Sequence, residues 1–171
     1  MEKLSLLEIN KNTIELDPTD KKKYYVKDMK ALKGKEPNLK WYMKYCDLVE
    51  MWIDANPRNT NDVIDLLMTG ADKVVLNPKF LTEKELKEIL EMSEDIALKI
   101  DEYHPELLEI FKKYGGEYIV IPLNLIEKFL DDTFHVLVIL PEGQDSTQLD
   151  VWGCVYERTE KSDSLYLENS R

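Results

Sequence analysis

Short, continuous apolar runs recur along the chain and alternate with stretches whose apolar residues fall on one helical face. Runs without internal alternation are typical of parallel strands that are covered on both faces. Strands that alternate with amphipathic helices form parallel βαβ units, whose right-handed crossovers place the helices outside the sheet. The runs expected to be strands cover residues 4–9, 24–26, 49–53, 73–76, 96–100, 118–121, 136–140 and 151–156.

Capping signals mark the ends of several predicted helices. Thr82 and Glu85 have the spacing of a capping box, in which each side chain accepts a hydrogen bond from the other residue's backbone amide. Gly70 ends an apolar stripe where a positive φ is needed, and Pro105 begins a helix that Gly115 stops. The expected helices cover residues 39–46 with Asn38 as N-cap, a segment from Thr60 or Asn61 as N-cap to residue 68, a segment from residue 83, residues 105–114 and residues 125–130.

The N-terminal region differs from the rest because two apolar runs lie close together. Residues 4–9 and 13–16 are separated by residues 10–12, which include two asparagines, and asparagine tolerates the positive φ of a tight turn. This pattern predicts a β-hairpin that leads through a turn at residues 17–20 almost directly into the strand at 24–26.

A chain of 171 residues is long enough for one domain with a hydrophobic core. We expect a single α/β domain over residues 1–158 and a polar tail over residues 159–171. The βα alternation predicts a shortened TIM-type barrel, since a complete barrel has roughly 250 residues. An open, mostly parallel sheet with flanking helices is the alternative, and its uncovered edge would favour a homo-oligomer.

Charge and composition narrow the classes of partner. The net charge of −11 disfavours binding to nucleic acid. Nine lysines between residues 21 and 44 stand against two acidic residues, which indicates either a solvated face or a local anion site. The N-terminus lacks a signal-peptide pattern and no apolar run is long enough to span a bilayer. We therefore expect no membrane partner and a cytoplasmic location.

No metal or cofactor motif is found. Cys46 and Cys154 fit no metal-ligand spacing and lie among apolar residues, so that we expect buried free thiols. His104 and His135, the only histidines, also lack such a spacing, and no glycine-rich nucleotide-binding pattern occurs. The sequence therefore predicts neither a metal site nor a cofactor.

Polar residues follow several predicted strands at the point where each strand ends. In parallel α/β proteins ligands bind at this edge of the sheet. Asp54, Asn77 and Asp101 recur at intervals of 23 and 24 residues, the length of one βα unit, and Glu8 and Asp28 end the two earlier strands. A closed barrel would place these side chains around one mouth. The alternative is that they cap the following helices or accept hydrogen bonds from loop amides.

Glu8 and Asp101 are the candidate catalytic pair among these residues. Two carboxylates on opposite sides of a mouth, one protonated and one ionised, can move a proton on and off a sugar carbon. The sequence thus predicts acid–base chemistry if the protein is an enzyme.

Three short motifs resemble those of a known family. They are DMKAL at residues 28–32 followed by GKEPN at residues 34–38, and WIDANPRN at residues 52–59. They resemble the Asp-Leu-Asp-Ala-Ile strand end, the Gly-Lys-x-x-Asn loop and the third strand of the phosphoribosylformimino-aminoimidazole-carboxamide ribotide isomerases of histidine biosynthesis. The resemblance extends over residues 22–103 and implies a phosphate-binding TIM barrel.

The resemblance also implies roles for single residues. Asp101 matches a fifth-strand Asp that serves as one acid–base group, and Glu8 stands where the other catalytic Asp would be. Lys30, Lys35 and Arg58 would hold the anionic group of a ligand. The full set of residues expected to bind the ligand is Asp28, Lys30, Lys35, Asp54, Arg58 and Asn77.

The chain departs from that family in its phosphate loops. Pro57 and Pro78 stand in two loops where the family has glycines, and only Gly143 corresponds to a later glycine-rich loop. Proline lacks the N–H group that a phosphate cradle requires. Two functions therefore stay open. One is a noncatalytic relative of the isomerases that binds a small anionic ligand or a protein partner. The alternative is an isomerase or lyase that acts on a phosphorylated sugar by carboxylate acid–base catalysis.

Overall fold

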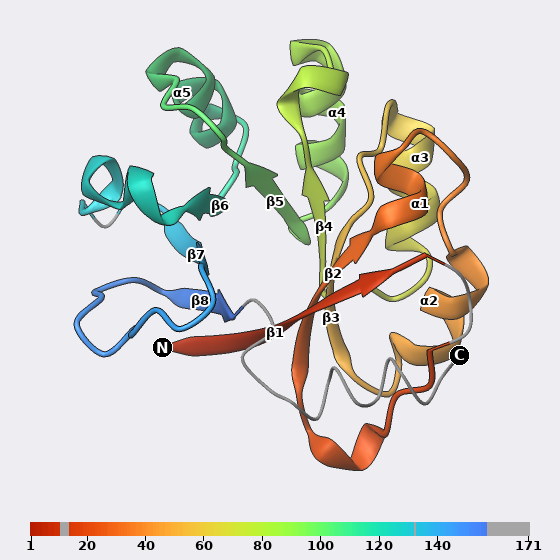
Figure 1. Cartoon of the computed structure of the whole chain (residues 1–171). Coiled ribbons are helices and arrows are strands. Elements are labelled where there is room, and N and C mark those ends of the chain that lie inside the picture. The colour runs from red at the N-terminus through yellow and green to blue at the C-terminus, as the bar shows by residue number, and fades with distance from the viewer. Residues whose placement is uncertain (11–13, 132, 157–171) are drawn as a thin grey trace.

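A computed structural model describes residues 1–10, 14–131 and 133–156, and its strands close into one barrel. Eight strands follow one another in sequence order, each parallel to its neighbours, and β1 pairs with both β2 and β8 (Figure 1). Closure confirms the predicted TIM-type barrel and excludes the open sheet. The strands are β1 (Glu2–Ile9), β2 (Lys23–Asp28), β3 (Glu50–Asp54), β4 (Lys73–Leu76), β5 (Ile96–Lys99), β6 (Tyr118–Pro122), β7 (His135–Leu140) and β8 (Gly153–Tyr156).

Helices cover only part of this barrel (Figure 1). Within the described residues no α-helix follows β1, β6 or β7, which explains how a short chain completes a barrel. None of the helices described is long and apolar enough to cross a membrane. They are the 3-10 helices η1 (Pro18–Asp20), η2 (Pro78–Phe80) and η3 (Leu123–Phe129), and the α-helices α1 (Met29–Leu32), α2 (Leu39–Tyr45), α3 (Thr60–Leu67), α4 (Glu83–Met92) and α5 (Pro105–Lys113).

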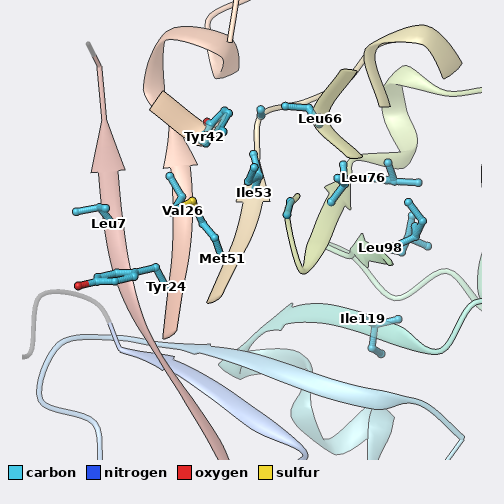
Figure 2. Packing of buried hydrophobic residues seen from close by; sticks show 14 of the residues in the cluster. Leu7, Tyr24, Val26, Tyr42, Met51, Ile53, Leu66, Leu76, Leu98 and Ile119 are labelled. Atoms are coloured by element: carbon cyan, nitrogen blue, oxygen red, sulfur yellow. The ribbon is translucent and has the colours of Figure 1, made fainter. Parts of the chain in front are cut away.

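Alternate residues of each strand pack into two different cores. One core receives side chains from all eight strands and fills the interior of the barrel. The other lies between the strands and the helices, where Val26 and Ile53 lie near Tyr42 of α2 and Leu66 of α3 (Figure 2). The interior core consists of Leu4, Leu6, Tyr25, Trp52, Val75, Ala97, Val120, Leu137 and Val155. Position within a strand therefore decides whether a residue reaches the barrel mouth or the helix layer.

Two of the predicted local signals are confirmed. The Thr82 hydroxyl accepts a hydrogen bond from the Glu85 amide, and the Glu85 carboxylate accepts one from the Thr82 amide, each at 3.1 Å. Gly70 adopts a φ of +92° after α3, the left-handed conformation expected for a residue that follows a helix.

Other local predictions are wrong in instructive ways. Residues 14–16 form no strand, because both edges of β1 are already occupied by β2 and β8. Residues 11 and 12 of the predicted turn, residue 13 of the second apolar run and the predicted tail at 159–171 lie outside the described residues. Asn59 rather than Thr60 or Asn61 caps α3, accepting from the Asp62 amide at 2.9 Å. Residues 125–129 belong to the 3-10 helix η3 instead of an α-helix.

The homo-oligomer prediction depended on an open sheet edge. A closed barrel has no unpaired edge strand, so this argument no longer applies. The oligomeric state stays an untested prediction.

Cys46 and Cys154 are both buried and unpaired, which confirms the predicted free thiols. Burial raises the pKa of the Cys46 thiol to about 11. Because the thiolate is the reactive form, we expect iodoacetamide at pH 8 to leave Cys46 unmodified in the native protein and to modify it after unfolding in urea. Peptide mass spectrometry measures both states, and rapid native modification of Cys46 would contradict its burial.

Candidate functional site at the carboxyl end of the barrel

The carboxyl ends of β1, β2 and β3 carry three charged residues in neighbouring positions. The strand register places Glu8 beside Lys27 and Lys27 beside Asp54. Strand alternation puts Lys27 and Asp54 on the interior side that Tyr25 and Trp52 occupy one layer below. The mouth therefore combines carboxylates with a lysine, and of these three residues the sequence pattern indicated Glu8 and Asp54 but not Lys27.

Asp54 is deeply buried in this mouth, with 1% of its side chain exposed. Its carboxylate accepts hydrogen bonds from Lys99 Nζ at 3.0 and 3.1 Å and from the Tyr25 hydroxyl at 2.9 Å. Burial, followed by the charge of Asp54, raises the pKa of Tyr25 well above its usual range, so that the hydroxyl remains a donor. Three strands, β2, β3 and β5, are thus connected across the interior by one polar cluster.

This cluster contributes little to the stability of the fold for the free energy that its burial costs. Removing a carboxylate and an ammonium group from water is unfavourable, and a buried ion pair often contributes no more than apolar residues of the same volume. The Lys99 side chain retains 17% exposure, so that the pair is not fully sealed from solvent. Active sites of TIM barrels lie at the carboxyl end of the strands, so this buried charge pair is a candidate functional group.

A hollow of about 340 Å³ opens between the segments that follow β4 and β5. Asn77 and Asp101, both predicted site residues, line it together with Lys99. Asp101 is exposed at the rim. Glu8 lies on β1 and is not among the lining residues, so this hollow does not bring together the predicted catalytic pair.

A second hollow, of about 170 Å³, lies between the loop after α1 and the loop after β3. Lys35 and Arg58 line it, whereas Lys30 of α1 lines neither this hollow nor the first. The Arg58 guanidinium lies 4.5 Å from the centre of the Phe80 ring, and a Cβ on Gly34 would lie 3.4 Å from its Nη2. No carboxylate in the described part of the chain forms an ion pair with this guanidinium.

Asn56 adds two unusual features to the second hollow. Its φ of +46° lies in the left-handed region, which is costly for a residue with a Cβ and recurs at functional sites. Its side-chain oxygen is buried and has no hydrogen-bond partner within the described residues. The hollow is thus lined by the Arg58 guanidinium and Lys35, together with the carboxylates of Glu36, Asp62 and Asp65.

Asp28 does not point into the mouth, although it was predicted to bind the ligand. It follows Lys27 directly and therefore faces the helix layer, where it is fully buried. Its carboxylate accepts bonds from the amides of Ala31 and Asn38 at 3.1 and 2.8 Å, from the Asn38 side chain at 3.0 Å and from the Tyr42 hydroxyl. Asp28 thus connects β2 to α1 and α2, and Asn38 donates to it instead of capping α2.

The chain's own side chains occupy several amides that could otherwise bind an anion. Asn77 accepts from the Lys79 amide at 3.1 Å, and His104 Nδ1 accepts from the Leu107 amide at 3.2 Å. A phosphate at either turn would have to displace these caps. An anion at these two turns would therefore have to bind side-chain cations instead of the capped backbone amides. Among the described residues no group of three or more His, Cys, Asp or Glu is arranged to hold a metal.

Sequence reasoning missed Lys27, Lys99 and Tyr25. A signal was present, because Lys27 and Lys99 are charged residues within otherwise apolar strands. A charge inside a strand that is covered on both faces needs a partner. The predicted site consisted mainly of residues at or just after the strand ends, and it therefore did not include Lys27, Lys99 and Tyr25, which face the barrel interior.

Comparisons with known proteins identify the fold and leave the family open. No family model matches the chain, and no curated protein matches it. Among solved structures it is similar to 3-keto-L-gulonate-6-phosphate decarboxylase from Streptococcus mutans in complex with D-ribose 5-phosphate. The TM-score is 0.72 at 11% identity, with 99% of this chain and 97% of that chain covered.

At 11% identity this likeness shows the barrel fold alone. It supports a TIM barrel and does not extend to the ribotide isomerases in particular. The motifs at residues 28–38 and 52–59 thus remain a sequence resemblance.

Proposed function

We propose that the protein binds a small phosphorylated sugar, or a similar small anion, at the carboxyl end of its barrel. The observation that carries this proposal is the Arg58 guanidinium. It is held against Phe80 at 4.5 Å, borders a hollow with Lys35 and has no ion-pair partner among the described residues. A guanidinium presents several donors in a fixed plane that matches the oxygens of phosphate or carboxylate.

Two further considerations support this ligand class. The structurally similar decarboxylase was crystallised with D-ribose 5-phosphate, a ligand of the proposed kind. The resemblance to ribotide isomerases points to phosphorylated sugars as well. In the proposed site, side-chain cations take the place of the glycine-rich loops that the chain lacks.

A thermal-shift titration tests this binding. We expect ribose 5-phosphate at a hundred times its dissociation constant to raise the midpoint by on the order of 5 °C, since ligand that binds only the native state stabilises it by mass action. Arg58→Met should abolish most of the shift, and Arg58→Lys should retain only part of it, because lysine keeps the charge but loses the planar donors.

Lys84→Met is the matched control for that titration. It removes one positive charge at an exposed position of α4 that lines neither hollow, and it should leave the shift unchanged. An equal loss of the thermal shift in Arg58→Met and Lys84→Met would indicate a nonspecific attraction of the ligand to positive charge. If phosphate, sulfate and a panel of sugar phosphates produce no shift in the wild type, the ligand proposal fails and a protein partner becomes the better hypothesis.

A catalytic role is the second candidate, and the Asp54–Lys99 pair favours it. An isomerase or lyase needs a base and an acid beside a bound carbonyl compound. Lys99 lines the first hollow with Asp101, while its amine contacts the buried Asp54. In this proposal Asp101 remains a candidate acid–base group, and Glu8 remains one on the β1 side of the mouth.

A further inference from the structure

Lys99 belongs to two environments at once. It is the last residue of β5, and its Nζ lies 3.0 and 3.1 Å from the two carboxylate oxygens of Asp54. Lys99 is also one of the residues that line the hollow of about 340 Å³ between the segments after β4 and β5. The residue that pairs with the buried carboxylate therefore also borders a space that a small molecule could enter.

The neighbours of Lys99 have the arrangement of an activated nucleophile. Such sites place a nucleophile within hydrogen-bond reach of a base, which a third group holds in position. Here Lys99 is the amine, Asp54 the base, and Tyr25 the positioning group, which donates to Asp54 at 2.9 Å. Tyr25 is fully buried, so its hydroxyl has little freedom to turn elsewhere.

The walls of the hollow suit a small organic molecule better than a bare ion. Pro78, Ile100, Leu107 and Ile110 supply apolar surface, and the volume fits a compound of a few carbon atoms. A lysine amine beside an apolar space can attack a carbonyl carbon once a neighbouring base has taken its proton.

We propose that Lys99 forms an imine with the carbonyl group of a small aldehyde or ketone bound in this hollow. The ammonium gives one proton to Asp54, and the free amine adds to the carbonyl carbon, forming the C–N bond. The former carbonyl oxygen takes one proton from the new C–N nitrogen and becomes a hydroxyl. Asp54 then returns its proton to this hydroxyl, which leaves as water, while nitrogen keeps one hydrogen and a positive charge. Ammonium and carbonyl compound thus become protonated imine and water, with no oxidation and no net gain or loss of protons.

Charge balance favours this product in the structure. The protonated imine carries the same charge as the lysine it replaces and retains one N–H group for Asp54. The Asp54 carboxylate therefore has a cationic partner before and after the reaction, and it is protonated and neutral in between, so that no isolated charge is left buried.

This inference goes beyond the proposed function, because it places a carbonyl compound in the hollow that Lys99 lines and not in the hollow beside Arg58. The two can fail separately. A thermal shift with ribose 5-phosphate but no trapping at Lys99 would uphold anion binding and overturn the imine. Trapping at Lys99 by an uncharged aldehyde, with no shift from any phosphorylated sugar, would uphold the imine and overturn anion binding.

Reductive trapping tests the imine directly. The native protein is incubated briefly with glycolaldehyde or with dihydroxyacetone phosphate in the presence of cyanoborohydride, and labelled lysines are identified by peptide mass spectrometry. Lys73 is an internal control, because its side chain is 16% exposed, close to the 17% of Lys99, and it pairs with Asp95 at 3.2 Å. We expect at least about tenfold more label on Lys99 than on Lys73 with one of the two probes.

Variants separate activation of Lys99 from its accessibility. Asp54→Asn and Tyr25→Phe should lower labelling of Lys99 and change its pH dependence, without affecting labelling of Lys73. Lys99→Arg should remove the adduct, whereas Lys73→Arg should leave labelling of Lys99 as in the wild type. Circular dichroism confirms that each variant is folded before trapping. Labelling of Lys99 no greater than that of Lys73 with both probes overturns the proposal.

Discussion

Replacing Asp28 by alanine is expected to lower the free energy of unfolding by about 3–5 kcal/mol. Asp28 is fully buried and accepts four hydrogen bonds, from two backbone amides, the Asn38 side chain and the Tyr42 hydroxyl. Alanine leaves all four donors without a partner in a place that water does not reach. Each unsatisfied buried donor costs about 1–3 kcal/mol, although relaxation of the loop after α1 recovers part of the sum.

Urea denaturation followed by circular dichroism measures this loss. Tyr42→Phe removes only one donor of the same network and should cost about 1 kcal/mol. Asn59→Ala removes a solvent-exposed cap of α3 and should also cost about 1 kcal/mol, which provides a surface reference. If Asp28→Ala falls within about 1 kcal/mol of the wild type, the network does not hold β2 to α1 and α2 as described.

The same variants decide between the two roles considered for Asp28. Asp28→Asn preserves the shape of the side chain and one acceptor oxygen, and it should remain folded, although less stable. Because Asp28 faces the helix layer, we expect this variant to keep the thermal shift with sugar phosphate that Arg58→Met loses. Loss of the shift in folded Asp28→Asn would restore Asp28 to the ligand site.

The fold was largely predictable because its signals are local. Apolar runs, the capping box at Thr82 and Glu85, and Gly70 each depend on residues a few positions apart, and the structure confirms them. The hairpin failed because strand pairing is not local. Residues 14–16 have the composition of a strand, but β8, from the other end of the chain, pairs with the edge of β1 that they would need.

The candidate site was predictable only in part, for a related reason. Neighbouring residues in a strand face opposite sides, so a difference of one position separates Lys27 in the mouth from Asp28 in the helix layer. The partnership of Asp54 with Lys99 joins residues 45 positions apart and arises only when the barrel closes. Composition and spacing therefore located the mouth but could not assign its contacts.

Replacing Lys99 by methionine is expected to destabilise the protein by about 3–5 kcal/mol, because it leaves the Asp54 carboxylate buried without its cation. Asp54→Leu should have a similar effect, since it strands the Lys99 amine and the Tyr25 hydroxyl. In the triple variant Tyr25→Phe, Asp54→Leu, Lys99→Met, no polar group of the cluster remains. We expect it to lie within about 1 kcal/mol of the wild type or to be more stable.

The triple variant tests whether the fold itself requires the Tyr25–Asp54–Lys99 cluster. A triple variant as stable as the wild type would mean that the fold does not require the Tyr25–Asp54–Lys99 cluster, as expected if the cluster serves the site. The measured quantity is the urea midpoint, which is compared with that of Lys73→Met, a variant that breaks the ion pair with Asp95 at the amino end of the barrel. A triple variant as unstable as Lys99→Met would instead show that apolar residues cannot fill the mouth, and the buried pair would then be a structural requirement of this short barrel.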